Sequence, residues 1–436
     1  MKKNNEEEKK QQNLGDVYTH GAFTLNKKII IVTSMVLIIV LITTLAIGIL
    51  SQKQKSTIVE ANKTNFNLQN NEHMHVELDA SGDKVPVPNG YVGSKVTGEN
   101  EINTGYVIYE GEEEVNYTNK DEAQKSRNQY VWIPVPDISK FYGIDSNGKK
   151  WGKIYEFSSY TGSSYDEVTG THPLNWRESN GIMELYEDTL DESYREPDIL
   201  EINDYDSRLK MLEIGAKTTH EFLKQVETEF NNMLTSVEKY GGFYIGRYET
   251  GNISQNIPVI QKGNTDIDYQ AWYNVYKRCK NIKGSNTNIE TGLIWGSQWD
   301  RTLMWLIESG NKTKEQIADD STSWGNHYNA TFEYLNRNGG IEIKNAYYPR
   351  WIPTGSTEYT KANNIYDLSG NIMEWTMETN DRKCKNQRGG SYIYQGDYNQ
   401  ASYRGSNDTT NSKMRLSFST LYKVNKKCKK HIIKNR

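Results

Sequence analysis

An α+β fold is predicted by the sequence. A few amphipathic helical stretches stand among many short, irregular strands that are rich in aromatic and branched residues. Strands and helices do not alternate regularly, as they would in a parallel α/β sheet, and no internal repeat is visible. The 436 residues are only 35% hydrophobic, so the 30 tyrosines and 10 tryptophans must supply much of the core.

The first element is an apolar run over residues 29–50, which follows a charged tail at residues 1–28. As a helix with about 1.5 Å rise per residue, this run would reach roughly 33 Å, enough to cross a bilayer. Lysines are more frequent before the run than just after it, which predicts that the tail stays inside. We therefore expect a single-pass protein of the cell membrane with an ectodomain outside.

The remaining chain is predicted to form one ectodomain at residues 85–422, joined to the membrane by a polar stalk at residues 51–84. Residues 140–217 are polar and turn-rich, so we interpret them as a surface insertion. Residues 423–436 form a basic tail. Without its first 50 residues the chain carries 46 basic and 52 acidic residues, a net charge of -6, which argues against general nucleic-acid binding.

Helices are predicted at residues 218–240, 271–279 and 298–310. The first begins with a capping-box pattern, Thr218 and Glu221, and ends at Gly241. Strands are predicted at residues 105–109, 129–135, 241–249, 388–394, 401–404 and 414–422. Pro134 restricts the second of these to a sheet edge or a strand end. Tryptophans of the helical and motif segments are expected in the core: Trp299, Trp305 and Trp375.

The three cysteines, Cys279, Cys384 and Cys428, are too few for a disulfide framework. None forms a CxxC pair, so zinc binding is not indicated. A bridge between Cys279 and Cys384 remains open.

The segment NIYDLSGNIMEWT, residues 364–376, holds the main candidates for ion binding or catalysis. Asp367 and Glu374 flank a Ser-Gly-Asn turn in which Gly370 relaxes the backbone. Three readings are open from the residue types: an ion-binding turn, a pair of catalytic carboxylates, or a tight corner held by its own hydrogen bonds.

This segment, followed by RGGSYIY, ASYR and MRLSFSTLY, resembles the C-terminal half of the formylglycine-generating enzyme (sulfatase-modifying factor) family. GGFYIGRYE and GLIWGSQWDRTLMWL are similar to earlier segments of that family. The resemblance implies an irregular fold related to C-type lectins and stabilised by calcium. It also implies four calcium ligands in the turn: the side chains of Asp367 and Glu374 and the carbonyls of Gly370 and Ile372.

The same resemblance argues against the family's chemistry. Its oxidases bind copper(I) and a substrate thiol through two cysteines after the Gly-Gly-Ser strand, and thiolates suit copper(I). Those positions fall at Tyr394 and Asn399, so copper is not expected as a cofactor. The iron-dependent branch needs a histidine cluster that the sequence lacks. An oxidase with a site rearranged around Cys384 remains the alternative from another class.

A binding function is therefore favoured. The residues after Ser391 are rich in Tyr, Asn, Ser, Asp and Gly, a composition typical of adaptable binding loops. The binding candidates are Tyr394, Asp397, Asn399 and Tyr403. Arg388, Arg404 and Arg415 are interpreted as structural partners of carboxylates. The sequence thus suggests a bacterial surface protein that binds a protein or glycan or mediates adhesion, with a structural role in a pilus-like or secretion assembly as a further alternative.

Overall fold

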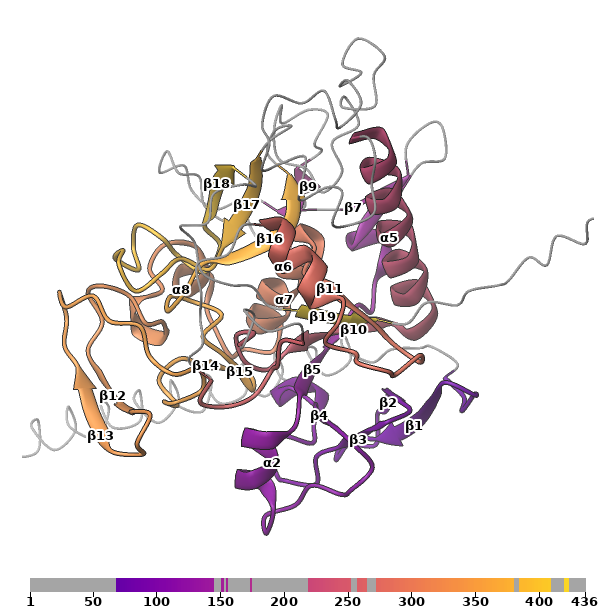
Figure 1. Cartoon of the computed structure of the whole chain (residues 1–436), viewed down its shortest axis with the longest axis horizontal. Helices are drawn as coiled ribbons and strands as arrows, with labels where there is room; N and C mark the ends of the chain where they lie inside the picture. The colour runs from indigo at the N-terminus through magenta and orange to yellow at the C-terminus, as the bar shows by residue number, and fades with distance from the viewer. Residues whose placement is uncertain are drawn as a thin grey trace, which may run out of the picture. The chain divides into compact units, whose positions relative to one another are not determined.

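A computed structural model describes residues 68–144, 150–152, 154–155, 173–174, 219–251, 257–264, 272–379, 384–408 and 419–422. The chain divides into two units, residues 1–60 and residues 61–436, and every described residue belongs to the second. Helices and small antiparallel sheets are mixed along that unit (Figure 1), so the α+β part of the predicted fold class is confirmed.

The predicted membrane anchor is corrected. Within the described ranges, no helix is both long enough and apolar enough to cross a bilayer. Helix α5, Thr219–Tyr240, has 22 residues, but it is amphipathic and carries charged residues such as Lys224, Glu227 and Glu238 outside its buried face. The apolar run at residues 29–50 lies outside the described residues. The predictions of a transmembrane helix and of a single-pass membrane location are therefore wrong for the structure described.

The largest sheet has six strands in the order β11-β19-β10-β5-β4-β3, and all neighbouring pairs are antiparallel. Pro134 ends β5 opposite Gly242, at the strand-end position that the sequence predicts. The strands of this sheet are β3 (Tyr91–Gly93), β4 (Val107–Glu110), β5 (Gln129–Pro134), β10 (Gly242–Gly246), β11 (Glu290–Leu293) and β19 (Ser419–Tyr422).

A three-stranded antiparallel sheet follows the turn motif: β16 (Glu374–Thr379), β17 (Cys384–Arg388) and β18 (Arg404–Asp408). The strands predicted at residues 388–394 and 401–404 are wrong, because pairing stops at Arg388 and starts again at Arg404. Gly389 and Gly390 explain the stop: their φ angles of 87° and 74° turn the chain out of the extended conformation.

Paired short strands make up the other sheets. They are β1 (Met74–Leu78) with β2 (Lys84–Pro88), β6 (Tyr142–Ile144) with β7 (Lys150–Gly152), β8 (Ile154–Tyr155) with β9 (Pro173–Leu174), β12 (Phe332–Leu335) with β13 (Ile341–Lys344), and β14 (Lys361–Ala362) with β15 (Ile365–Tyr366). Strand β1 falls within the stretch that was predicted to be a stalk, residues 51–84. Met74 of this strand is buried against the domain. The folded part thus begins before residue 85. Most of the predicted insertion at residues 140–217 lies outside the described residues.

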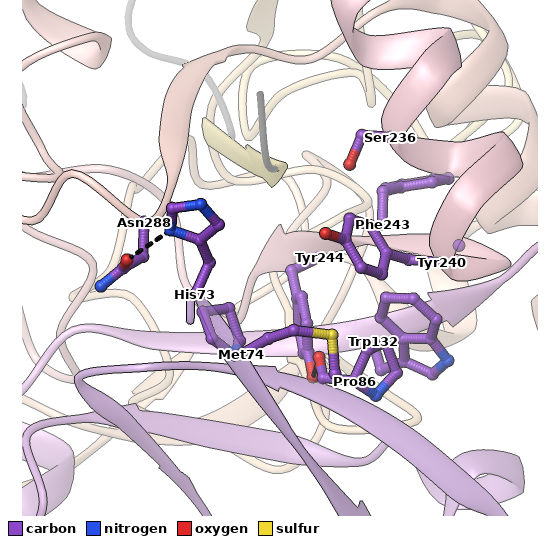
Figure 2. A pocket seen from close by; sticks show the side chains of 11 residues that line it. His73, Met74, Pro86, Trp132, Ser236, Tyr240, Phe243, Tyr244 and Asn288 are labelled. Carbon is purple, nitrogen blue, oxygen red and sulfur yellow. Dashed lines mark hydrogen bonds between the residues drawn. The ribbon is translucent and has the colours of Figure 1, made fainter. Parts of the chain in front are cut away.

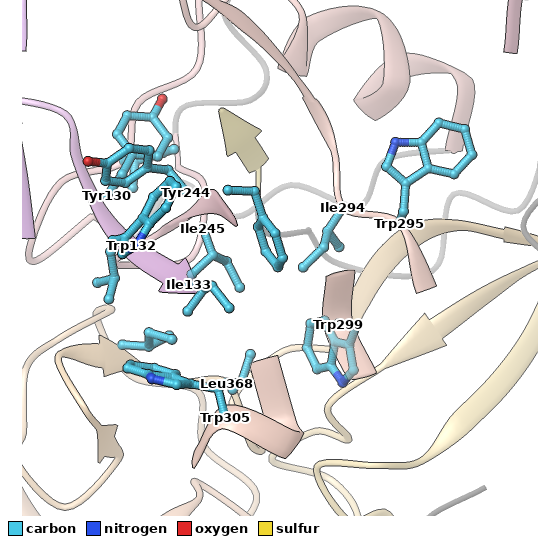
Figure 3. Close-up of a cluster of buried hydrophobic side chains, with 14 of the residues drawn as sticks. Tyr130, Trp132, Ile133, Tyr244, Ile245, Ile294, Trp295, Trp299, Trp305 and Leu368 are labelled. Atoms are coloured by element: carbon cyan, nitrogen blue, oxygen red, sulfur yellow. The ribbon is translucent and has the colours of Figure 1, made fainter. Parts of the chain in front are cut away.

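The remaining helices agree with the sequence pattern to within two residues where they were predicted. They are α6 (Trp272–Cys279) and α7 (Gly296–Glu308), with the shorter α2 (Lys120–Ser126), α8 (Lys314–Ala318), η1 (Ile102–Thr104), η2 (Ile138–Lys140) and η6 (Thr322–Trp324). Figure 3 shows Trp299 and Trp305 of α7 in the core beside β5 and β10. Trp299, Trp305 and Trp375 are all fully buried, which confirms their predicted core role.

A small gap lies between the β1–β2 pair, β10 and the end of α5 (Figure 2). Its lining includes Trp132, Tyr240 and Tyr244, and His73 accepts or donates a hydrogen bond with Asn288 at 3.0 Å at its edge. The gap measures about 30 Å³. That is room for about one water molecule, so we interpret it as a packing gap rather than a ligand site.

Candidate functional site

The turn motif at residues 364–376 places its polar groups inside the protein. Asp367, Gly370 and Asn371 have φ angles of 62°, 74° and 51°, in the left-handed region. Aspartate and asparagine tolerate that region, whereas a Cβ on residue 370 would lie 2.5 Å from the carbonyl oxygen of Asn326. All side chains of residues 362–378 are buried. The turn is therefore a core element that projects two carboxylates inward.

Asp367 is held by two donors on one of its oxygens. Its Oδ2 accepts hydrogen bonds from Thr354 Oγ1 at 2.8 Å and from the Gly355 N–H at 2.9 Å. Its Oδ1 is buried and has no hydrogen-bond partner among the described residues. Burial raises the pKa of Asp367, and its interactions with Thr360, the Gly355 N–H and Thr354 only partly offset that rise. One oxygen of this carboxylate is thus available for a further partner.

Glu374 is the most unusual group in the turn. Its side chain is completely buried, and neither carboxylate oxygen has a hydrogen-bond partner within the described part of the chain. Burial, followed by the charges of Glu249 and Asp367, raises its pKa well above 4.5. A buried, unpaired carboxylate costs several kcal/mol, by an order-of-magnitude estimate. This carboxyl must therefore be either protonated or neutralised by a cation.

Gly389 makes room for Glu374. A Cβ at Gly389 would lie 2.5 Å from Glu374 Oε2 and 3.0 Å from the carbonyl oxygen of Leu368. With φ at 87°, glycine is required both by conformation and by space. The Gly-Gly-Ser segment is therefore part of the wall of the carboxylate site.

Asn371, which the sequence interpretation passed over, is the hydrogen-bonding centre of the turn. Its Nδ2 donates to Glu249 Oε2 at 2.6 Å and to the Ile352 carbonyl at 3.2 Å. Its Oδ1 accepts from Asn326 Nδ2 at 2.9 Å and from the Ile352 N–H at 3.0 Å. Every hydrogen-bonding position of the amide is used. An asparagine after the glycine of a buried turn is the signal that could have indicated this role.

The donor set of the turn fits a hard cation. The open oxygens of Asp367 and Glu374, together with main-chain carbonyls of the turn, are the ligand types that calcium prefers. In the described ranges, no three His, Cys, Asp or Glu side chains converge as metal ligands. A calcium ion at this turn would therefore rely on the predicted carbonyls of Gly370 and Ile372 for the rest of its coordination.

The pH dependence of stability should show whether a proton or a cation neutralises the carboxylate of Glu374. Without calcium, the folded state retains a proton that the unfolded chain releases above the ordinary pKa of 4.5, so the free energy of unfolding should fall as the pH rises above that value. Glu374→Gln should remove this slope. Millimolar calcium should raise the melting temperature of the wild type but not that of Glu374→Gln.

Glu358→Gln is the matched control for this titration. Burial alone would raise the pKa of Glu358, but hydrogen bonds from Tyr366 and Lys361 lower it overall. The contribution of Glu358 to stability is lost as the pH falls, whereas that of Glu374 is lost as the pH rises. A melting temperature of the wild type that depends neither on calcium nor on Glu374 at neutral pH would refute the site.

Beside the turn, two arginines and two carboxylates form a closed buried ring. Arg388 contacts Glu378 at 2.7 Å and Asp300 at 2.5 Å, while Arg404 contacts Glu378 at 2.8 Å and also Asp300. Asp300, Glu378 and Arg388 are fully buried and Arg404 is nearly so. The ring joins α7 to β16, β17 and β18. This confirms the prediction that Arg388 and Arg404 are structural partners of carboxylates. Arg415 lies outside the described residues.

The four predicted binding residues do not share one environment. Tyr394 is 40% exposed and Asp397 is exposed, whereas Tyr403 is half-buried. Asn399 is 1% exposed and its side-chain amide has no hydrogen-bond partner among the described residues. Asn399 therefore lies under the loop, where its main chain packs against Gly390, and only Tyr394 and Asp397 face solvent plainly.

The cysteines lie away from the Gly-Gly-Ser segment. Cys384 begins β17 and pairs with Asp408, at the opposite end of the strand from Arg388. Four residues of extended chain span about 13 Å. Cys279 is buried in α6 and forms no disulfide. A copper site that combined Cys384 with the segment around Ser391 would thus need the chain to rearrange.

Four exposed tyrosines and one half-buried tyrosine lie on segments that meet at the predicted loop. The Tyr328 N–H donates to the Tyr394 carbonyl at 2.8 Å, and the Tyr347 N–H donates to the Tyr328 carbonyl at 2.6 Å. The rings of Tyr328 and Tyr347 lie 5.7 Å apart, and those of Tyr394 and Tyr398 lie 6.2 Å apart. We call this set the tyrosine surface: Tyr328, Tyr347, Tyr348, Tyr394 and Tyr398.

Comparison with known proteins adds little to this geometry. No protein-family model matches the sequence, and no curated protein matches it. Among solved structures, the crystal structure of CarF is similar over 42% of this chain and 87% of that chain, with 12% sequence identity and a TM-score of 0.27. A likeness at that level supports no conclusion about fold or function. The resemblance to formylglycine-generating enzymes therefore stays a prediction.

Proposed function

We propose that this chain is a non-catalytic binding domain of the formylglycine-generating-enzyme type, which recognises its ligand through the tyrosine surface. One observation carries the proposal: exposed tyrosines from two distant segments converge on the loop that, by the resemblance, would hold the catalytic thiols. Tyr347, Tyr348 and Tyr398 are 66%, 62% and 54% exposed. Clustered tyrosines offer broad, rigid, amphipathic contact area at a low entropic cost.

The backbone beneath this surface is held in place. Lys344 is fully buried, and its ammonium donates to the main-chain carbonyls of His327, Tyr328 and Ala330. His327 is also buried, its Nε2 lies 2.9 Å from Ser369 Oγ, and burial lowers its pKa to about 4. A neutral His327 and an anchored main chain favour a preformed binding surface, which loses little entropy when a ligand binds.

The surface is tested by removing its rings. Tyr394→Ser combined with Tyr398→Ser should weaken binding to any ligand found on a glycan or peptide array at least about tenfold, because aromatic side chains dominate binding hot spots. Tyr117→Ser is the control: it removes a ring that is 69% exposed but does not belong to the tyrosine surface, so it should leave binding unchanged. Equal loss in both variants, or no loss in the first, would count against the proposal.

The oxidase alternative predicts a different result. Copper(I) titration of the full chain should show tight binding that Cys384→Ser abolishes if a rearranged thiol site exists. We expect no binding that depends on Cys384, because its strand position lies far from Ser391 along the sheet.

A further inference from the structure

The β12–β13 hairpin forms a two-stranded sheet of its own (Figure 1), and a neighbouring segment covers one of its edges. On that edge, the Leu335 N–H donates to the Ser356 carbonyl at 2.9 Å. The Glu333 carbonyl accepts a hydrogen bond from Thr357 Oγ1 at 2.7 Å. The segment that contains Ser356 and Thr357 therefore occupies the outer side of β12, and the other edge of the hairpin belongs to β13.

The register of the hairpin shows which main-chain groups face the β13 edge. Ile341 lies opposite Leu335, and Ile343 lies opposite Glu333. Along an antiparallel pair, residues that bond across the ladder alternate with residues whose N–H and C=O groups point away from it. Because the two β12 residues bond outward, their partners Ile341 and Ile343 also point both main-chain groups outward.

These outward groups of β13 are open. Within the part of the chain that the structure describes, no hydrogen bond from outside the hairpin reaches the main chain of Ile341 or Ile343. Two N–H donors and two C=O acceptors thus stand along one edge at the spacing of a β-strand. Such an edge is a template on which another extended chain can pair.

The usual protections of an edge strand do not operate on β13. The strand contains no proline, and its pairing with β12 runs without a shift in register. Its lysine, Lys344, is buried, and the ammonium donates to three main-chain carbonyls of the protein. Natural proteins commonly block such edges with prolines, bulges or outward lysines. The β13 edge is therefore regular and unblocked.

The side chains beside the open edge are apolar and exposed. Ile341 is 71% exposed, Ile343 is 56% exposed and Leu335 is 43% exposed. Strand alternation places them on the outer face of the hairpin, because Phe332 is buried on the inner face and stacks on Tyr359 at 4.5 Å between ring centroids. An added strand would gain cross-strand contacts with these residues as well as main-chain hydrogen bonds.

The charges and bonds of β13 disfavour a second copy of this chain as the added strand. Pairing Ile341 of one copy with Ile343 of the other would place the two Glu342 side chains opposite each other, and like charges there are destabilising. A symmetric pairing centred on Ile343 would place Ile341 opposite Asn345. The carbonyl of Asn345 already accepts a hydrogen bond from the Tyr348 N–H at 3.3 Å. A different chain, without an acid opposite Glu342, fits the edge better.

We propose that the open edge of β13 binds an extended segment of another protein as an added antiparallel strand. The segment has branched apolar residues at alternate positions, beside Ile341 and Ile343, and neutral or basic residues between them, opposite Glu342. Its main chain supplies most of the affinity and its alternating side chains supply the selectivity. The antiparallel direction is the more stable one per residue. The edge shares no residue with the tyrosine surface, so this site goes beyond the proposed function.

Fluorescence anisotropy of a labelled peptide titrated with the full chain tests the assignment. The peptide alternates valine and threonine and carries a lysine at each end for solubility. One probe is N-methylated at its valines, which lie opposite Ile341 and Ile343 and turn their N–H groups to the edge. The other is N-methylated at its threonines, whose N–H groups face solvent. We expect the threonine-methylated probe to bind at least about tenfold more tightly than the valine-methylated one.

Ile343→Pro removes one outward N–H but no hydrogen bond of the β12–β13 ladder, a position at which edge strands tolerate proline. It should weaken binding of the threonine-methylated probe at least about tenfold. Ile343→Ala is the matched control, because it also shortens the side chain but keeps the N–H. It should bind this probe more tightly than Ile343→Pro does. The comparison of the two probes needs no substitution, so it tests the edge even if the proline disturbs the hairpin.

The Tyr394→Ser, Tyr398→Ser double variant should bind the threonine-methylated probe like the wild type, which separates this test from that of the tyrosine surface. Equal affinity for the two probes, failure of both to bind, loss of binding in the double variant, or equal binding by Ile343→Pro and Ile343→Ala would each overturn the assignment. In sedimentation analysis, a wild-type dimer that Ile343→Pro converts to a monomer would also overturn it, because the edge would then pair with a second copy.

Discussion

Arg388→Met is expected to lower the free energy of unfolding by about 3–5 kcal/mol, the usual cost of removing one partner from a buried ion pair. The reason is the closed ring around α7. Without Arg388, the fully buried carboxylates of Asp300 and Glu378 share the single guanidinium of Arg404. Denaturant unfolding followed by tryptophan fluorescence would measure the loss.

A double variant shows whether charge balance is the cause. Arg388→Met with Glu378→Gln removes one charge of each sign, so it should be more stable than Arg388→Met alone. Lys361→Ala, which breaks an exposed pair with Glu358, should change stability by less than about 0.5 kcal/mol. Purely additive losses in the double variant would show that packing, and not charge, explains the effect.

Asn371→Gly is expected to cost about 3–4 kcal/mol, because it removes four hydrogen bonds and leaves the buried Glu249 Oε2 without its amide donor. Glycine accepts the φ of 51°, so this loss reports the side chain alone. Asn371→Ala should cost about 1 kcal/mol more, since alanine is strained in the left-handed region. Thermal and denaturant unfolding measure both.

Asn371→Asp provides the sharper control. It keeps the size of the side chain but places a second acceptor against Glu249 Oε2, where the amide had donated. We expect Asn371→Asp to be destabilised at neutral pH and partly rescued in mild acid, where one of the two carboxyls takes a proton. A variant as stable as the wild type at neutral pH would contradict the role of Asn371.

Local periodicity explains which predicted elements are correct. The 3.6-residue spacing of Val226, Phe230, Met233 and Val237 predicts α5, and the aromatic and branched runs predict β5 and β10. The strands after Arg388 are shifted because two glycines with positive φ end the pairing, which residue type alone does not reveal. Strand β1 was missed because five residues with one buried methionine carry too weak a pattern.

The sequence by itself determined the α+β class, the main helices and the position of a polar, glycine-containing turn, because backbone geometry imposes its period on neighbouring residues. It also singled out Asp367 and Glu374. The tertiary structure alone decided their surroundings: Asn371 meets Glu249 across 122 residues, and Arg388 meets Asp300 across 88. It also decided that Asn399 is buried while Tyr394 is exposed, and that the guanidinium of Arg337 lies 5.3 Å from the ring centroid of Trp351. Such pairings arise only when the folded chain brings distant segments together, and no local spacing encodes them.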